Sequence, residues 1–273
     1  MTIEEGHFAS GGLQLFRRAL RVERPLARVL VLHGYGDHSG RYEPFMRSLA
    51  GAGIESHAYD FRGHGRSGGR RGFVSPWDQY LDDLQAFVAT VPSDVPQFVV
   101  GHSHGGLVTA TAVERGMLAQ VGGVVLCSPF LVSAVVVPFG KRILAAGANL
   151  LIPAIRIANG LKAEMMTDDP DMLADARQDP LLLRSATPRW YHGVTRAQPR
   201  VMRDAGQFTL PLQMLIGTDD VIASPLGNRQ FFQACAAGDK SLIEYPGMRH
   251  ELLRESGRAK VFHDIHQWII ART

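Results

Sequence analysis

The sequence predicts an α/β fold in which helices cover both faces of a doubly wound, mostly parallel sheet that carries a helical cap insertion. Short runs rich in β-branched residues alternate with longer stretches of helical periodicity, and several runs are apolar throughout, as in strands buried on both faces. The predicted strands cover residues 28–32, 53–59, 97–100, 122–126, 212–216 and 241–245. The predicted helices cover residues 42–52, 77–91, 105–115, 225–237 and 257–272.

The alternation of strands and helices breaks off at about residue 130 and resumes after about residue 208. The stretch between is helical or irregular, contains no convincing strand, and has prolines at positions 138, 153, 170, 180, 188 and 199. We therefore expect a core formed by residues 1–129 and 209–273 and a cap formed by residues 130–208. The cap is expected at the carboxyl end of the sheet, where ligands bind in such folds.

Composition and charge exclude several classes of protein. The 273 residues are 45% hydrophobic and 20% charged, as in an ordinary globular protein. With 29 Lys and Arg against 26 Asp and Glu, the formal charge of +3 is too weak to indicate a nucleic-acid partner. Cys127 and Cys235 are too few and too far apart for a disulfide framework or a zinc site, so we expect reduced core thiols.

Neither a secretory signal nor a membrane span is expected from the sequence. The N-terminus MTIEEGHFAS has acidic residues where a secretory signal needs basic ones. The most apolar region, residues 130–161, is interrupted by Lys141, Arg142 and Arg156 and cannot supply a bilayer span. We expect a cytoplasmic protein, with peripheral membrane contact through the apolar cap as an option. The sequence carries no indication of oligomeric state.

The segment from Gly101 to Gly105 is the strongest catalytic motif. It reads Gly-His-Ser-His-Gly and fits the G-x-S-x-G pattern between a predicted strand and a predicted helix. In this context the pattern indicates a sharp strand-to-helix turn that projects the hydroxyl of Ser103 clear of the sheet, with glycines that leave room for the turn. The alternative is a chance match in a loop that starts a helix.

Two further strand ends supply the partners that such a serine requires. A serine hydroxyl needs an imidazole to accept its proton and a carboxylate to orient that imidazole. Asp219 and Asp220 follow the predicted strand 212–216, and His250 lies in the loop after the last predicted strand. We expect His250 to be the base and Asp220 the acid. Asp219 is expected to be a capping or turn residue, with the reverse assignment of the two aspartates left open.

Acyl transfer also requires hydrogen-bond donors for the oxyanion. One candidate is the backbone N–H of His104, at the positive end of the helix that follows the nucleophile. The other is the backbone N–H of Tyr35, in the loop His33-Gly34-Tyr35-Gly36 after the first long strand. The alternative for this loop is a glycine-rich turn without a catalytic part.

Together these motifs resemble those of the monoacylglycerol lipase and lysophospholipase group of the α/β-hydrolase superfamily. The resemblance covers nearly all of the predicted core, in order, and implies the α/β-hydrolase fold and a serine esterase or lipase. It is carried by His33-Gly34, His38-Ser39-Gly40-Arg41-Tyr42, the segment from Asp60 to Gly68, the Gly101–Gly105 motif, Gly217-x-x-Asp220 and Gly247-x-x-His250-Glu251.

The resemblance also suggests residues that contact the substrate. In that group the segment after the His-Gly pair helps to hold the glycerol head, which makes Asp37 and Arg41 candidates for hydroxyl recognition, with a structural ion pair as the alternative. Among the apolar cap residues, Leu131 and Ile152 are candidates for contact with an acyl chain. Plain packing of the cap onto the core is the alternative for both.

Three positions depart from the common pattern of the group. Tyr35 is bulky where a small residue is frequent, Asp37 is one methylene shorter than the usual Glu, and His104 replaces a frequent Met. None of these changes removes a catalytic group. A second imidazole near the nucleophile is nevertheless expected to alter the pH profile, and headgroup choice is expected to differ from that of the group.

The sequence therefore predicts a hydrolase that cleaves esters of single-chain lipids, such as monoacylglycerols or lysophospholipids, through an acyl-enzyme, without a metal or organic cofactor. Two alternatives use the same triad: acyl transfer to an alcohol or amine, and hydrolysis of an amide or peptide. A third alternative is a lipid-binding module without turnover. The complete set of Ser103, Asp220 and His250 argues against that module.

Overall fold

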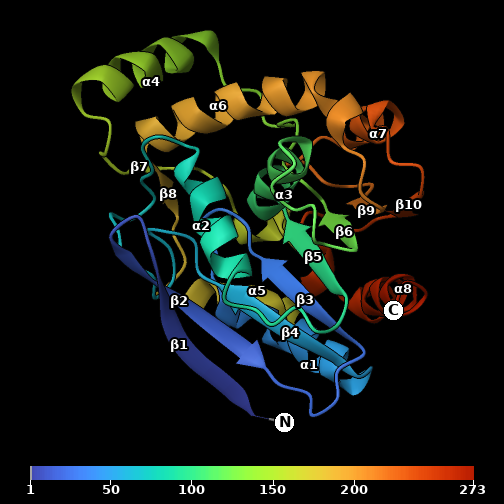
Figure 1. The fold of residues 1–273 in the computed structure, drawn as a ribbon. Coiled ribbons are helices and arrows are strands. Elements are labelled where there is room, and N and C mark those ends of the chain that lie inside the picture. Colours follow the sequence, from blue (N-terminus) through green and yellow to red (C-terminus); the bar gives the residue numbers. More distant parts are fainter. Residues whose placement is uncertain (1) are drawn as a thin grey trace.

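The computed structural model describes residues 2–273 and contains an eight-stranded sheet in the order β1-β2-β4-β3-β5-β6-β9-β10 (Figure 1). All six strands predicted from the sequence are present, and neighbours among them are parallel, which confirms the doubly wound sheet. These strands are β3 (Ala27–Leu32), β4 (Ile54–Tyr59), β5 (Gln97–His102), β6 (Gly123–Cys127), β9 (Leu212–Gly217) and β10 (Lys240–Tyr245).

An antiparallel hairpin at one edge of the sheet was not predicted. It consists of β1 (Ile3–Ser10) and β2 (Leu13–Leu20), and β2 also runs antiparallel to β4. The connection is Gly11-Gly12, with φ values of 53° and 76°. Two consecutive residues with positive φ match the twist of a two-residue hairpin, so this glycine pair is the local reason for the turn.

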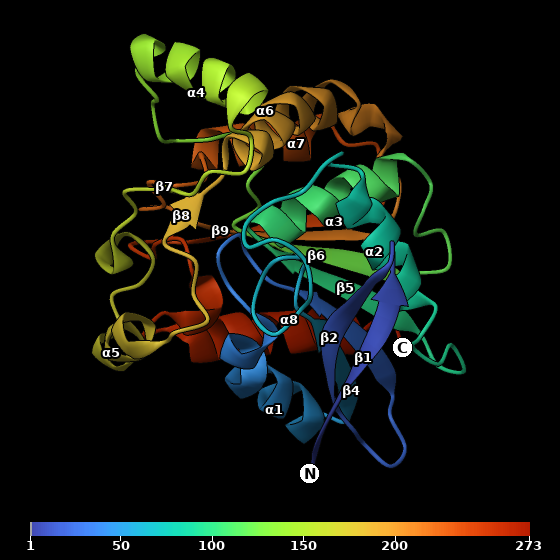
Figure 2. The ribbon, with the colours of Figure 1, turned by 90° about the vertical axis from the view of Figure 1, so that its left-hand side faces the viewer.

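Helices cover both faces of the sheet, as Figure 2 shows. One face packs against α2 (Gln79–Val88), α3 (His104–Glu114) and α7 (Pro225–Ala234), and the other packs against α1 (Glu43–Gly51) and α8 (Arg258–Ile270). Every residue of β3 and β5 is buried, which explains the apolar runs 29–32 and 98–101 within these strands. Both cysteines are buried and free, which confirms the expectation of reduced core thiols.

A helical segment interrupts the sheet between β6 and β9. It contains α4 (Phe139–Leu151), α5 (Pro170–Gln178), α6 (Pro188–Arg203) and a minimal ribbon of β7 (Ile157–Ala158) with β8 (Ser185–Ala186). In Figure 1, α4 lies against α6 at the top of the molecule, on the side of α6 away from the sheet. The exact limits of the cap, 130 and 208, stay a prediction.

Four short 3₁₀ turns complete the structure: η1 (Ser39–Tyr42), η2 (Ala163–Met165), η3 (Ala205–Gln207) and η4 (Leu252–Arg254). None of the helices within residues 2–273 combines the length and apolar character that crossing a membrane requires.

Candidate active site

Ser103 occupies a strained turn between β5 and α3. Its φ is 52° and its ψ is −116°, a conformation that costs a non-glycine residue about 1–3 kcal/mol. The flanking glycines make the turn possible, because a Cβ at Gly101 would lie 2.7 Å from Thr109 Oγ1 and a Cβ at Gly105 would lie 2.4 Å from Leu32 O. The sequence motif thus forms the sharp strand-to-helix turn that its context predicted.

Three side chains that are distant in the sequence meet at this turn. Nε2 of His250 lies 2.8 Å from Oγ of Ser103, and Nδ1 of His250 lies 2.7 Å from Oδ2 of Asp220. All three residues are buried, and they come from the segments that follow β5, β9 and β10. Because the carboxyl ends of parallel strands meet at one edge of the sheet, the strand order itself brings these groups together.

The two neighbouring aspartates have different surroundings. The second oxygen of Asp220 accepts hydrogen bonds from the N–H groups of Ile222 and Ala223, at 2.8 and 2.9 Å, so the carboxylate is fixed toward His250. Asp219 is exposed, and its Oδ1 accepts a hydrogen bond from Thr218 Oγ1. The geometry agrees with Asp220 as the partner of the imidazole and Asp219 as a turn residue.

The backbone amides of Tyr35 and His104 lie beside Ser103. His104 is the first residue of α3, so its N–H has no intrahelical acceptor. Within residues 2–273, neither this N–H nor that of Tyr35 donates to another protein atom. The loop carrying Tyr35 lies against the nucleophile, because a Cβ at Gly34 would be 3.4 Å from Cβ of Ser103. Both amides therefore keep free donors for an oxyanion, the role predicted for them.

A cavity of about 380 Å³ opens at Ser103, which lines it together with Tyr35, His102 and His250. Its apolar wall comes mainly from the cap. The apolar side chains that line it are Phe130, Leu161, Met166, Leu182, Leu183, Trp190 and Ile222. The wall can hold an apolar chain next to the nucleophile.

Neither Leu131 nor Ile152 lines this cavity, contrary to expectation. Leu131 is fully buried in the core, whereas its neighbour Phe130 faces the cavity and donates its N–H to Ser103 O at 2.9 Å. Ile152 follows α4 and is 50% exposed, because α4 lies outside α6. Sequence reasoning missed Trp190 and Ile222; for Ile222 the only available signal was its place two residues after Asp220.

Asp37 and Arg41 belong to a buried ion-pair network. The guanidinium of Arg41 donates to Asp37 Oδ1 at 3.0 Å and to both oxygens of Glu251 at 3.0 Å, while Tyr42 Oη donates to Asp37 Oδ2 at 3.1 Å. Burial works to raise the pKa of Asp37, but the combined effect of Arg41, His33, His38 and Arg254 outweighs it and holds that pKa below its ordinary value. The geometry favours the structural ion pair over direct hydroxyl recognition, although both residues also line the cavity.

The imidazole of His104 is buried and does not line the cavity at Ser103. It is fully buried among the rings of Tyr35, Phe61, Trp77, Tyr80 and Trp190, and neither ring nitrogen has a hydrogen-bond partner within residues 2–273. Burial lowers the pKa of His104 to about 3, so the ring stays neutral at physiological pH. A ring that stays neutral gives no reason for an altered pH profile, so the effect expected from His104 stays an untested prediction.

The second imidazole near the triad is that of His102. Its ring centroid lies 5.0 Å from that of His250, and the residue lines the cavity. Burial, followed by the charge of His250, lowers the pKa of His102 to about 4. His102 was missed as a site residue, although it is the second residue of the nucleophile motif.

An eight-stranded, mostly parallel sheet with a serine, a histidine and an aspartate at its carboxyl edge defines the class of α/β-hydrolases. Within that class, the family described as serine aminopeptidase, S33, matches residues 23–257, and the chain belongs to this family.

Similar proteins indicate which enzymes of this family the chain resembles. Human monoglyceride lipase is 31% identical over 257 residues, which cover 91% of this chain and 84% of that protein. Phospholipase YtpA of Bacillus subtilis is 27% identical, and the match covers 89% of this chain and 94% of that protein. The structure of a soluble variant of monoglyceride lipase from Saccharomyces cerevisiae, in complex with a substrate analogue, superimposes with a TM-score of 0.89 at 25% identity, over 100% of this chain and 97% of that one. The predicted fold, resemblance and enzyme class, a monoacylglycerol lipase-like serine esterase, are confirmed.

Proposed function

We propose that the protein hydrolyses carboxylic esters of single-chain lipids, monoacylglycerols or lysophospholipids, through an acyl-enzyme on Ser103. The observation that carries the proposal is the hydrogen-bonded line from Ser103 to His250 and Asp220, with spacings of 2.8 and 2.7 Å, next to an apolar cavity. These hydrogen bonds activate the hydroxyl of Ser103 as a nucleophile, and the cavity has space for one acyl chain.

The cycle has two halves. In the first, His250 accepts the proton of Ser103 as Oγ attacks the ester carbonyl, and the N–H groups of Tyr35 and His104 stabilise the oxyanion. The tetrahedral intermediate collapses, and His250 returns the proton to the departing alcohol. In the second half, water attacks the acyl-enzyme while His250 accepts a proton from it. Collapse then returns that proton to Ser103 Oγ and releases the fatty acid.

The substrate class is supported by the cavity wall and by the relatives. Most of the surface that lines the cavity is apolar, which suits a hydrocarbon chain. The names of similar proteins, monoglyceride lipase and phospholipase, describe activities of those proteins and agree with a lipid ester as the substrate here.

Amide or peptide hydrolysis is the second candidate, because the family is described as a serine aminopeptidase. An aminopeptidase needs a free carboxylate to anchor the substrate amine. The cavity carboxylates Asp37 and Glu251 are both bonded to Arg41, and Glu164 lies 2.6 Å from Arg177. Because these cavity carboxylates are already paired with arginines, the cavity favours hydrolysis of an ester over hydrolysis of a peptide. Acyl transfer to an alcohol or amine uses the same acyl-enzyme and differs only in the acceptor.

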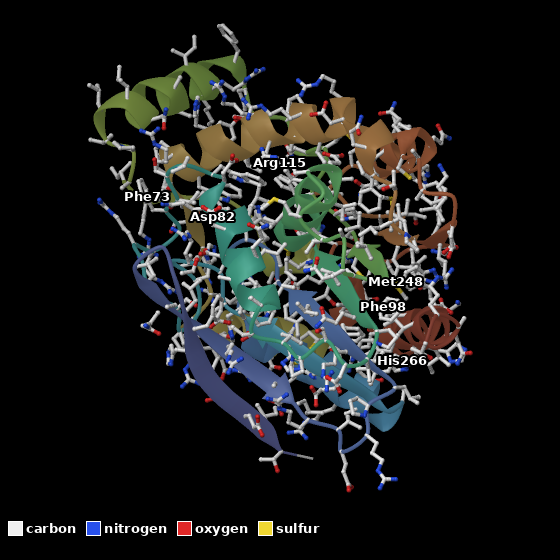
Figure 3. The ribbon with its side chains drawn as sticks, in the orientation of Figure 1. Phe73, Asp82, Phe98, Arg115, Met248 and His266 are labelled. Carbon is white, nitrogen blue, oxygen red and sulfur yellow. The ribbon has the colours of Figure 1, made fainter. Side chains whose placement is uncertain are left out.

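We also propose that α4 docks on a lipid surface. Large apolar side chains project from this helix into solvent, and Figure 3 shows side chains extending from its outer side. The most exposed are Phe139, Leu144, Leu150 and Leu151. An amphipathic helix of this kind can lie in the membrane interface, where lipid esters reside.

The test is a panel of monoacylglycerols, lysophospholipids and short p-nitrophenyl esters assayed with wild type and Ser103→Ala. We expect Ser103→Ala to lower kcat by about 10⁴-fold or more without loss of folding. Ser48→Ala, on α1 and away from the cavity, is the control and should behave as wild type. Ester hydrolysis by Ser103→Ala at the wild-type rate would refute the proposed function, and preferred cleavage of amides would favour the second candidate.

A further inference from the structure

The backbone of His250 is held on both sides. The N–H of Arg249, which precedes it, donates to Oε1 of Glu255 at 2.6 Å. The N–H of Glu251, which follows it, donates to the carbonyl of Met166 at 2.7 Å. A buried carboxylate and a carbonyl of the insertion therefore hold the backbone N–H groups of the two residues next to His250. Loss of either bond would free the loop that carries the proton acceptor.

The second oxygen of Glu255 also reaches the insertion. Oε2 accepts hydrogen bonds from Thr167 Oγ1 at 3.2 Å and from the N–H of Asp168 at 2.9 Å. Glu255 is 1% exposed, so water does not compete for these donors. One side chain thus joins the catalytic histidine loop to the segment that contains Met166 and Thr167, both of which line the cavity.

Further bonds join the same two segments. Asp168 Oδ1 accepts from the N–H and the hydroxyl of Ser256, at 3.2 and 2.9 Å. The guanidinium of Arg249 donates to the carbonyls of Glu164 and Thr167, at 2.8 and 3.0 Å. These bonds surround Glu255, which is the buried side chain at the centre of the junction.

We propose that Glu255 is a positioning residue, which aligns His250 with Ser103 by holding the N–H of Arg249 and tying the histidine loop to the cap segment 164–169. The inference rests on the proposed function of Ser103 and His250. It assigns to Glu255 no contact with the substrate. Its action is the orientation of the imidazole, on which proton transfer depends.

The ionisation state of Glu255 matters for this role. As a carboxylate it accepts from all three donors, Arg249 N–H, Asp168 N–H and the Thr167 hydroxyl, whereas protonation turns one oxygen into a donor. Burial, followed by the Asp168 carboxylate, raises the pKa of Glu255 to about 7. The aligned arrangement is therefore lost as pH falls through about 7.

The other charged groups at the junction act on this ionisation. The guanidiniums of Arg249 and Arg258 and the carboxylates of Asp168 and Asp169 surround Glu255. Full activity then requires that Glu255 be deprotonated.

Glu255→Gln is the direct test. Glutamine keeps one oxygen to accept from Arg249 N–H, but its NH₂ group cannot accept from Asp168 N–H. We expect kcat to fall by about 10- to 100-fold with little change in KM, as for a misaligned catalytic group. In wild type, log(kcat/KM) should fall more steeply below about pH 7 than in the variant, because the variant lacks the Glu255 carboxyl, whose pKa is about 7.

Asp168→Asn tests the same inference without changing Glu255. The amide oxygen still accepts from Ser256, but the negative charge that raises the pKa of Glu255 is gone. The acid limb of the pH profile of kcat/KM should therefore move to lower pH. The control is Glu114→Gln: Glu114 ends α3, its pKa is raised by burial to about 8, and it has no contact with the histidine loop. Its removal should leave the acid limb unchanged.

The outcomes separate this inference from the proposed function. Wild-type kcat and an unchanged slope in Glu255→Gln, with Ser103→Ala inactive, would overturn the role of Glu255 and leave the proposed function intact. Activity in Ser103→Ala would overturn the proposed function itself. If Glu255→Gln does not fold, Asp168→Asn becomes the test. A pH profile whose acid limb is the same in Asp168→Asn and in wild type would then overturn the inference.

Discussion

Trp190 stacks on Tyr35, with ring centroids 3.6 Å apart and an interplanar angle of 27°. Trp190 comes from α6 in the cap, and Tyr35 comes from the loop whose N–H is a candidate oxyanion donor. The buried His104 ring packs against both in T-shaped contacts, with centroids 6.1 Å from Tyr35 and 5.8 Å from Trp190. Through Trp190 the cap therefore contacts the side chains of both residues whose N–H groups are the candidate oxyanion donors.

Removing the Trp190 ring should therefore affect stability and catalysis together. For Trp190→Ala we expect a loss of about 3–5 kcal/mol in the free energy of unfolding, because a large buried ring is replaced by a void. We also expect a lower kcat, because Tyr35 loses the surface that fixes its loop. Urea denaturation and ester hydrolysis measure the two effects. Trp190→Phe keeps a stacking ring and should recover most of both; a Trp190→Ala variant with wild-type kcat would show that the stack does not support the oxyanion loop.

Asp220→Asn and Asp219→Asn form a matched pair that tests the triad acid. In Asp220→Asn the amide can still accept from Ile222 N–H, but it can present a donor to His250 Nδ1 and favour the wrong tautomer. We expect kcat to fall by about 10⁴-fold, as for comparable triads. Asp219→Asn, at an exposed position, should keep wild-type kcat. The reverse result would transfer the acid role to Asp219.

The sheet could be predicted because its strands carry strong local patterns. β3 and β5 are buried at every position and so are apolar at nearly every position. The β1–β2 hairpin was missed because its strands are rich in charge. Arg18 of β2 is buried all the same, since its guanidinium lies 3.4 Å from Glu5 and its Nε donates to Ser39 Oγ at 3.1 Å. Such pairing depends on tertiary neighbours that local pattern does not reveal, although Gly11-Gly12 signals the turn.

The triad could be predicted because Ser103, Asp220 and His250 each follow a strand, and topology brings strand ends together. Trp190 and Glu255 could not be predicted, because Trp190 stacks on Tyr35 and Glu255 joins Arg249 to Thr167 and Asp168, which lie far away along the chain. The choice between Phe130 and Leu131 also lay beyond the sequence: both are apolar, and only the backbone direction at the start of the cap determines which one faces the cavity.

His104→Met should leave the pH profile of hydrolysis unchanged but make the fold more resistant to acid. His104 stays neutral in the folded state because burial lowers its pKa to about 3, whereas the unfolded chain binds a proton below about pH 6.5. Acidification therefore favours the unfolded wild type. Between pH 7.5 and pH 5, wild type should lose about 2 kcal/mol more stability than the variant. Denaturation curves at the two pH values test this; an equal loss in both proteins would mean that His104 is protonated in the fold.

Polar substitutions on α4 should weaken binding to lipid vesicles. Leu150 and Leu151 are 81% and 79% exposed, and withdrawal of two leucines from a lipid surface should weaken binding by about tenfold or more. Leu150→Gln with Leu151→Gln is the test, measured by co-sedimentation with vesicles, and hydrolysis of a soluble p-nitrophenyl ester should stay unchanged. Leu226→Gln, an exposed leucine on α7, is the control. Equal vesicle binding by all proteins would rule out docking through α4.

The mouth of the cavity carries more cations than carboxylates, which bears on headgroup preference. Lys162, Arg177 and Arg184 line the cavity and are exposed, whereas the one exposed carboxylate among the lining residues is Glu164, 2.6 Å from Arg177. An anionic headgroup should therefore be favoured over neutral glycerol.

For Lys162→Ala and Arg184→Ala we expect KM for 1-octanoylglycerol 3-phosphate to rise by about two- to fivefold each, the range of an exposed ion pair, while KM for 1-octanoylglycerol stays constant. Added salt should raise the first KM and not the second, because screening weakens the attraction. Arg200→Ala, on α6 and outside the cavity lining, is the control. Equal changes in KM for the two soluble substrates would mean that these cations do not select the headgroup.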